Sequence, residues 1–178
     1  MGGGDRDEGA WGIPLLRTLG ASAWLVRHHE LVVEAAELIC DALARELDVP
    51  MDRALILVGA SLHDAGKIVH PEEMSNSGHA HEASGVTLLI AAGVAPAAAR
   101  FCATHAAWNG PDCVIEDALV ALADKLWKGK RDEALERHLL SLIAKLTRRE
   151  PWDVFDRFDA CCEDVAAGGS DRLSRSAV

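Results

Sequence analysis

The stretch MDRALILVGASLHDAG, residues 51–66, decides the fold of the chain. Up to His63 it is apolar on every side of a helix, which predicts a central helix enclosed by other helices. Asp52 is a suitable N-cap for this helix, and Gly66 is a suitable C′ residue to end it. The segment therefore places a polar pair, His63 and Asp64, at the end of a buried helix.

The rest of the chain also favours helices. Hydrophobic residues make up 49% of the sequence, aromatic residues only 4%, and Tyr is absent, a composition that suits helices better than sheets. Apolar residues recur at helical spacing almost throughout. Besides 51–66, we expect helices over about 14–26, 28–47, 79–93, 96–106, 113–128, 131–148 and 151–166. The sequence therefore predicts an all-α fold, a bundle of about seven to eight helices.

The length of 178 residues suits one domain with a sizeable core, which we place at residues 13–167. Residues 1–12 are acidic and Gly-rich, and residues 168–178 are polar, so we expect a disordered N-terminus and a flexible C-terminal tail. The first residues lack the basic and apolar regions of a signal peptide. The five Cys residues form no CxxC motif, which favours reduced thiols. Together these features predict a cytoplasmic protein.

The charge of the chain limits its partners. A net charge of −10 argues against a nucleic-acid polymer, whose binding needs a basic surface. No apolar run approaches the length of a membrane span, so we expect no membrane partner. A small phosphorylated ligand is compatible with an acidic chain, because bound metal ions can reverse the local field. A homo-oligomer is compatible with the sequence but is not specified by it.

Two pairs of histidines compete for places on the inner faces of helices. His28 is followed along its helical face by more apolar residues than His29, so we expect His28 to point inward. His79 and His81 lie about 200° apart around a helix axis and cannot face the same site. We choose His81, because Gly85 one turn later allows a close approach of backbone or ligand.

Three further positions carry polar groups where apolar ones are expected. His63 and Asp64 lie about 100° apart on their helix, so they can flank one object beside the helix end. His105 ends a helix, where a structural capping role is also reasonable. Asp124 lies on a face with Val120 and other apolar residues, and a buried carboxylate needs a cation or hydrogen-bond donors.

These candidates together come from five helices, and one shared site explains them more economically than five separate structural roles. Imidazole and carboxylate groups suit divalent Mn, Fe, Co or Ni, with Zn and Mg also possible. Six ligands are too many for one ion that keeps open positions, but suit two ions with a bridging carboxylate. The predicted ligands are His28, His63, Asp64, His81, His105 and Asp124.

In this order, these residues resemble the HD-domain superfamily of metal-dependent phosphohydrolases. The local sequences RHHELVVEAAEL, LHDAGK, HEASGVTLL and ALADKL are similar to the family's metal-binding motifs, and the resemblance covers about residues 24–131. It implies a helical bundle around the metals. It also implies how the ions are held: His28, His63, Asp64 and Asp124 would bind one, and His81 and His105 the other, with Asp64 bridging.

The chain also departs from the family pattern. Ala106 follows His105, where many members have two adjacent histidines. The Gly-Tyr-Pro signature of cyclic-dinucleotide phosphodiesterases is missing after WNG, which argues against hydrolysis of cyclic di-GMP.

The resemblance implies an enzyme that releases phosphate from a small phosphomonoester, with a nucleotide or nucleoside phosphate as the expected substrate. A metal-bound hydroxide would attack phosphorus in line. We expect Asp64 and Lys67 to be catalytic, with Lys67 holding a phosphate oxygen. Lys128 and Arg131 are further candidates for the substrate phosphate, although both also read as a charged surface helix end. Trp108 could stack on a base or simply pack.

Two other functions fit the same ligand set. Some HD-fold proteins resemble this chain in all six ligands but hold a mixed-valent di-iron centre and use O₂ as oxygenases. A non-catalytic sensor could bind a nucleotide at the same place. The six residues do not separate these functions, and uptake of O₂ or turnover of phosphoesters would.

Overall fold

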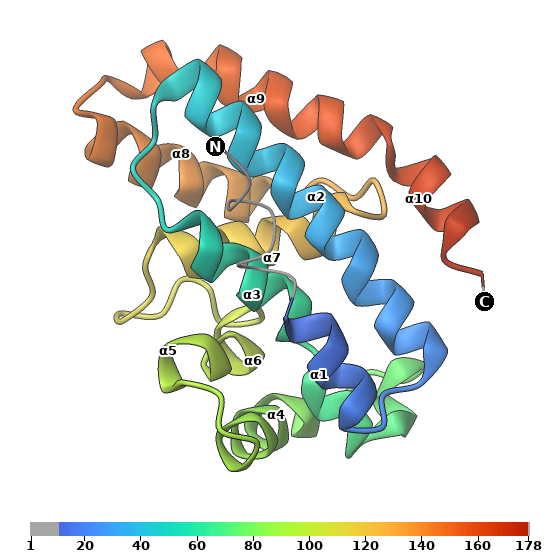
Figure 1. Cartoon of the computed structure of the whole chain (residues 1–178). Coiled ribbons are helices and arrows are strands. Elements are labelled where there is room, and N and C mark those ends of the chain that lie inside the picture. Colours follow the sequence, from blue (N-terminus) through green and yellow to red (C-terminus); the bar gives the residue numbers. More distant parts are fainter. Residues whose placement is uncertain (1–10, 178) are drawn as a thin grey trace, which may run out of the picture.

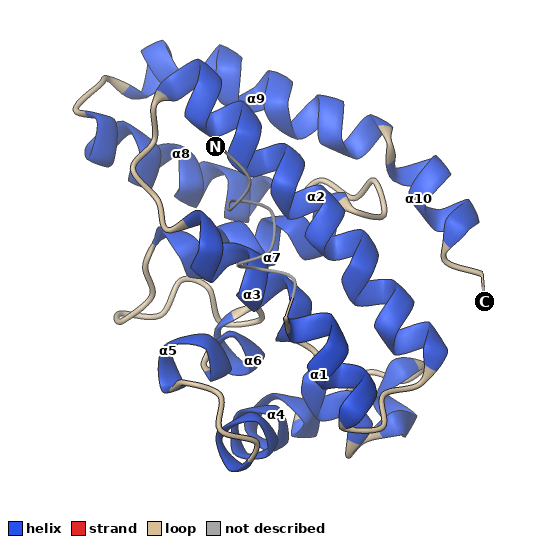
Figure 2. Ribbon diagram, viewed as in Figure 1, coloured by secondary structure: helices blue, strands red, loops and turns tan. Residues whose placement is uncertain are grey.

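The computed structural model describes residues 11–177, and all regular elements in that range are helical, as the sequence predicts (Figures 1 and 2). The elements are α1 (Gly12–Thr18), α2 (Ala23–Leu47), α3 (Arg53–Leu62), the 3₁₀ helices η1 (Ala65–Ile68) and η2 (Pro71–Met74), α4 (Ala80–Ala91), α5 (Pro96–Ala99), α6 (Phe101–Thr104), α7 (Ile115–Leu126), α8 (Glu133–Thr147), α9 (Pro151–Ala167) and α10 (Gly169–Arg175). Within residues 11–177, no helix is both long and apolar enough to cross a membrane.

Helix α3 lies at the centre of the bundle (Figure 1). It contacts α1, α2, α5, α6 and α7, and every residue from Ile56 to Leu62 is buried. Asp52 caps its N-terminus, where the carboxylate accepts a 2.9 Å hydrogen bond from the backbone N–H of Leu55. The buried helix expected from the apolar stretch is therefore present, with the expected N-cap.

The expected role of Gly66 is wrong. This glycine does not adopt a left-handed conformation to end α3, because the chain continues directly into η1. A Cβ atom at Gly66 would lie 1.8 Å from the carbonyl oxygen of His81. Gly66 is needed because η1 approaches the first turn of α4 too closely for any side chain.

The helix expected over 14–26 is also divided in two. Helix α1 ends at Thr18, and α2 begins at Ala23. The hydroxyl of Ser22 accepts a 3.2 Å hydrogen bond from the backbone N–H of Leu25, so Ser22 is an N-cap rather than a helix-interior residue. A side-chain bond of this kind competes with helix continuation and starts a new helix instead.

Two apolar clusters make up the core. The larger one joins α2, α3, α7, α8 and α9, and the smaller one joins α1, α3, α4 and α5. Figure 1 shows the corresponding separation, with α8 and α9 on one side of α3 and α4, α5 and α6 on the other. Helix α3 contributes to both clusters, so its C-terminal end lies where the two halves of the bundle meet.

The C-terminal segment expected to be a flexible tail is helical over most of its described residues, 168–177. Residues Gly169–Arg175 form helix α10, and the guanidinium of Arg172 is buried there with only 3% exposure. Arg172 donates to the carbonyl oxygens of Trp127 at 2.8 Å and Leu126 at 3.2 Å, at the end of α7. Polar composition suggested disorder, but these contacts satisfy the carbonyl of Trp127 and give that of Leu126, which also accepts from the N–H of Gly129, a second donor. At the other terminus, residues 1–10 of the expected disordered segment lie outside the described residues.

Candidate metal centre

Six side chains from different elements meet beside the C-terminal end of α3. Helices α2, α4 and α7 contribute His28, His81 and Asp124, and His63, Asp64 and His105 stand at or just beyond the ends of α3 and α6. The side chains form two groups of three, and in each group the potential ligand atoms lie within 4.8 Å of one another.

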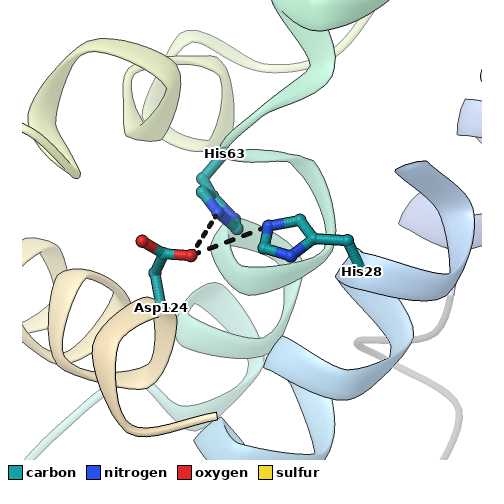
Figure 3. A group of neighbouring side chains, drawn as sticks. All are labelled: His28, His63 and Asp124. Carbon is teal, nitrogen blue, oxygen red and sulfur yellow. Dashed lines mark ion pairs between the residues drawn. The ribbon is translucent and has the colours of Figure 1, made fainter. Parts of the chain in front are cut away.

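The first group consists of His28, His63 and Asp124. The Nε2 atoms of both histidines lie 3.6 Å from Oδ1 of Asp124. Figure 3 shows the two rings and the carboxylate pointing toward one another from three separate helical segments. Three ligand atoms of this kind face a common point, as a metal site requires.

The second group consists of Asp64, His81 and His105. The Nε2 atoms lie 3.3 Å (His81) and 3.6 Å (His105) from Oδ1 of Asp64. The other oxygen of Asp64, Oδ2, faces the first group and lies 3.4 Å from Nε2 of His28. One carboxylate therefore presents one oxygen to each group.

The unsatisfied polar atoms of these residues test whether a metal would fit. Among residues 11–177, no hydrogen-bond partner is present for the buried Nε2 atoms of His28, His63 and His81 or for Oδ1 of Asp64. Leaving such atoms unpaired costs about 1–3 kcal/mol each. All four face the centre of the cluster, and a divalent cation is the partner that imidazole lone pairs and a carboxylate share. The residues present therefore fit a metal centre.

Comparison with known protein families agrees with this geometry. The family model described as HD domain matches residues 25–128, which is more than half of the chain and includes all six residues of the cluster. The chain belongs to the HD domain family. No curated protein and no solved structure gives a significant match to the chain. HD domains bind divalent metals and generally act as metal-dependent hydrolases, and both groups of this HD domain could hold a metal ion.

Backbone carbonyls orient two of the histidines in this HD domain. Nδ1 of His63 donates to the carbonyl oxygen of Ala60 at 3.0 Å, and Nδ1 of His105 donates to that of Phe101 at 3.0 Å. A carbonyl can only accept, so Nδ1 carries a proton, and in the neutral ring the lone pair is on Nε2. Both rings therefore direct a lone pair toward the cluster.

The two carboxylates are ionised at neutral pH. Burial alone would raise the pKa of Asp64, but the neighbouring His63, His28 and His81 hold it well below its usual range. Burial acts in the same way on Asp124, and His63 again lowers the pKa below the usual value. Two negative charges in a largely buried site favour a bound cation.

The competing histidines lie outside both groups. His29 is fully buried, but its Nδ1 donates to the carbonyl oxygen of Ala60 at 3.1 Å and the residue belongs to neither group. The side chain of His79 is 87% exposed and its Nδ1 lies 2.8 Å from a carboxylate oxygen of Glu82. The structure thus brings His28 and His81 into the cluster.

Glu73 was not among the residues predicted from the sequence. This residue lies in η2, outside the expected helices, and its Oε2 accepts a 2.5 Å hydrogen bond from Nδ1 of His81. That bond is the main reason why the pKa of Glu73 is lowered to about 2. Sequence spacing gave no signal, because Glu72 and Glu73 are adjacent and only the fold decides which one faces His81.

Two of the three basic candidates lie at the centre. Nζ of Lys67 is 2.6 Å from Oδ2 of Asp64, and Nζ of Lys128 is 3.9 Å from Oδ2 of Asp124. Both lysines line a cavity of about 410 Å³ that opens over the cluster.

Arg131 does not reach this cavity. Its guanidinium pairs with Glu136 at 2.7 Å and Asp159 at 2.6 Å, and it lines a different hollow between α8 and α9. The expectation that Arg131 contacts substrate is therefore not supported by its position. It follows Lys128 closely in sequence, but the chain turns after the end of α7 at Gly129, whose φ is +75°.

Aromatic side chains form part of the cavity wall. Trp24 stacks on the ring of His28 at a centroid distance of 5.8 Å and an angle of 5°, and Trp127 meets the same ring edge-on at 5.2 Å. Both tryptophans line the cavity, whereas Trp108 packs against His138 and the larger core cluster. The position of Trp24 one turn before His28 was a usable signal, because residues four apart share a helix face.

Proposed function

We propose that this HD domain is a dinuclear phosphohydrolase that releases phosphate from a small phosphomonoester. The observation that carries the proposal is the placement of Asp64, whose two oxygens face the two different histidine groups. A carboxylate between two ligand sets is the arrangement that two-metal hydrolytic sites need. Membership of the HD domain family supports the same reaction class.

The first ion would be held by His28, His63, Asp64 and Asp124, and the second by Asp64, His81 and His105. Mn, Fe, Co and Ni suit this donor set, and Zn or Mg are also compatible with it. When bound, such ions would make water acidic enough to ionise near neutral pH and would neutralise negative charge on a phosphoryl group.

The lysines of the cavity would place the phosphate. Lys67 and Lys128 both line the cavity, the first beside Asp64 and the second beside Asp124. In the absence of substrate, each ammonium group is near a carboxylate that would otherwise carry uncompensated charge. A phosphate ester entering the cavity would offer non-bridging oxygens to both ammonium groups, and hydrogen bonds between charged groups are the strong ones. Lys67 and Asp64 are thus our candidates for direct participation in the reaction.

The apolar part of the cavity wall favours a substrate with a planar group. Trp24 is 40% exposed while one face of its indole is stacked on His28. Met74 and Trp127 add apolar surface to the same cavity, whose volume of about 410 Å³ lies within the range of about 300–1,000 Å³ typical of small-molecule sites. We therefore propose a nucleotide or nucleoside phosphate, with its base near Trp24, as the partner of this site. The five free cysteines suit a reducing compartment, and we propose the cytoplasm.

A metal-reconstituted screen tests this function. Protein purified without chelators is analysed for metal content, loaded with Mn, Fe, Co or Ni, and assayed for phosphate release from nucleoside monophosphates and sugar phosphates. We expect two bound ions and turnover of at least one monophosphate, with no turnover by Asp64→Asn. Uptake of O₂ in proportion to substrate would instead support the oxygenase, and nucleotide binding without turnover would support the sensor. Failure to bind any of these metals would overturn the proposal.

A further inference from the structure

The carboxylate of Glu73, in η2, accepts three hydrogen bonds from the first two residues of α4. Its carboxylate is largely buried, with 10% of the side chain exposed. Oε2 accepts hydrogen bonds from Nδ1 of His81 at 2.5 Å and from the backbone N–H of His81 at 3.1 Å. Oε1 accepts a third from the backbone N–H of Ala80 at 3.1 Å. One carboxylate thus holds both the ring and the backbone of His81.

This arrangement distinguishes His81 from the other histidines of the cluster. His63 and His105 donate from Nδ1 to neutral backbone carbonyls, and Nδ1 of His28 has no hydrogen-bond partner among residues 11–177. Only His81, of these four, donates to a carboxylate. A carboxylate partner fixes the ring orientation and makes the opposite nitrogen a stronger ligand.

We infer that Glu73 is a positioning residue for His81, and that it sets the affinity of the second metal position separately from the first. The inference rests on the proposed dinuclear centre and adds a residue that controls one half of it. The carboxylate of Glu73 accepts hydrogen bonds only from Ala80 and His81 among residues 11–177, and from neither histidine of the first group. Its loss would therefore affect the two positions unequally.

The rest of α4 is anchored without Glu73. Leu89 of this helix is fully buried in the smaller core cluster, and the first turn of α4 lies against the backbone of Gly66 in η1. Removal of the negative charge from Glu73 would therefore weaken its hold on the ring of His81 while leaving the helix in place. This separates a positioning role from a folding role.

Gly78 provides an independent way to displace the carboxylate. A Cβ atom at this position would lie 2.2 Å from Oε1 of Glu73 and 2.4 Å from its Cδ. Gly78→Ala would therefore push the Glu73 side chain away without changing any charge. Gly78 and Met74 also line the cavity, so the segment that holds His81 forms part of the substrate wall.

Titration of the protein with Mn²⁺ tests the inference. Calorimetry measures the affinity for Mn²⁺, and electron paramagnetic resonance detects the spin-coupled pair of bound Mn²⁺ ions. We compare wild type, Glu73→Gln and Gly78→Ala with Glu72→Gln as the matched control. Glu72 lies on the same turn, and its exposed carboxylate contacts His70 rather than His81. We expect both test variants to keep the first site and to bind the second Mn²⁺ about 10–100-fold more weakly, the usual cost of losing such a partner.

The alternatives give different results. Equal affinity for the second ion in wild type, Glu73→Gln and Gly78→Ala overturns the inference and leaves the dinuclear centre intact. Equal weakening of both sites also overturns it, because the effect must be selective. Loss of the helical circular dichroism signal in Glu73→Gln would assign the residue a structural role instead. A wild-type protein that binds fewer than two Mn²⁺ ions would overturn the dinuclear proposal itself, and the inference with it.

Discussion

The two groups of candidate ligands are built on different kinds of structure. The first uses His28 and Asp124, inside helices α2 and α7 of the larger core cluster, and His63 at the end of the central helix α3. The second uses His81, at the second residue of α4, and His105, just beyond the four-residue helix α6. Asp64 faces both groups from the junction of α3 and η1.

This difference indicates that the ligands of the two metal positions are held with unequal rigidity. A side chain inside a helix that packs in the larger core is held by that core, which resists small displacements. A side chain at a helix end depends on local partners such as Glu73. We therefore expect the first position to be preformed and the second to be easier to empty, as the following variants can test in order of decreasing effect.

The largest effect is expected where the two groups meet. Asp64→Asn keeps the size of the side chain but removes the charge that faces both groups, so we expect loss of both ions and of all phosphate release. Elemental analysis and a phosphate assay measure this. Retention of two ions by this variant would contradict the bridging role. Thermal unfolding should show a folded protein, because removing the charge also removes a desolvation cost.

The variants His28→Ala and His105→Ala test directly whether the first group is the preformed one. If the first group is the preformed one, His28→Ala should leave the protein without tightly bound metal, whereas His105→Ala should retain one ion. Metal counting after gel filtration distinguishes the two. The opposite pattern, with one ion kept by His28→Ala only, would reverse the assignment of rigidity. His79→Gln is the control, because His79 is exposed. His29→Gln is less suitable, because His29 is fully buried.

Lys67→Gln should lower kcat/KM without removing metal. Loss of one charge-assisted hydrogen bond worth about 1.5–3 kcal/mol corresponds to about 10–100-fold in kcat/KM. Arg131→Gln is the matched control, since this residue pairs with Glu136 and Asp159 away from the cavity, and its kinetics should match wild type. A large loss in Arg131→Gln alone would mean that the substrate lies elsewhere.

Trp24→Leu should separate substrates by their planar part. If a base stacks on this indole, the variant should lose about 1–3 kcal/mol of binding to nucleoside monophosphates, seen as a raised KM. Sugar phosphates, which have no base, should be affected little. Trp108→Leu serves as a control for loss of a tryptophan outside the cavity. Equal effects of Trp24→Leu on both substrate classes would exclude the stacking role.

The smallest effect on the metal groups is expected from Arg172→Met. This change removes the guanidinium donor from the carbonyl oxygens of Trp127 and Val165, and one of two donors from that of Leu126, which should cost about 1–3 kcal/mol of unfolding free energy. Urea denaturation measures that loss. Because α10 braces the end of α7, which carries Asp124, a small weakening of the first metal site should accompany it. An unchanged urea midpoint would show that α10 does not support α7.

Much of the fold was predictable because its causes are local. The apolar run before His63 and the N-cap Asp52 predicted α3, and helical spacing predicted the all-α class. The errors came from contacts between distant segments. Gly66 meets the backbone of His81, and Arg172 reaches carbonyls more than forty residues earlier in the chain, and neither contact leaves a periodic pattern.

The sequence by itself determined the all-α class, through its helical spacing, and membership of the HD domain family, through its motifs. It also predicted which histidines and aspartates meet in the cluster, from helical faces together with the family resemblance. The tertiary structure alone decided the distances within the cluster and which oxygen of Asp64 faces each group. Only the tertiary structure shows that Glu73 rather than Glu72 contacts His81. Only the tertiary structure shows that Lys128 lines the cavity whereas Arg131 pairs with Glu136 elsewhere. The physical reason is that periodicity describes directions around one axis, whereas distances between side chains depend on how several axes pack together.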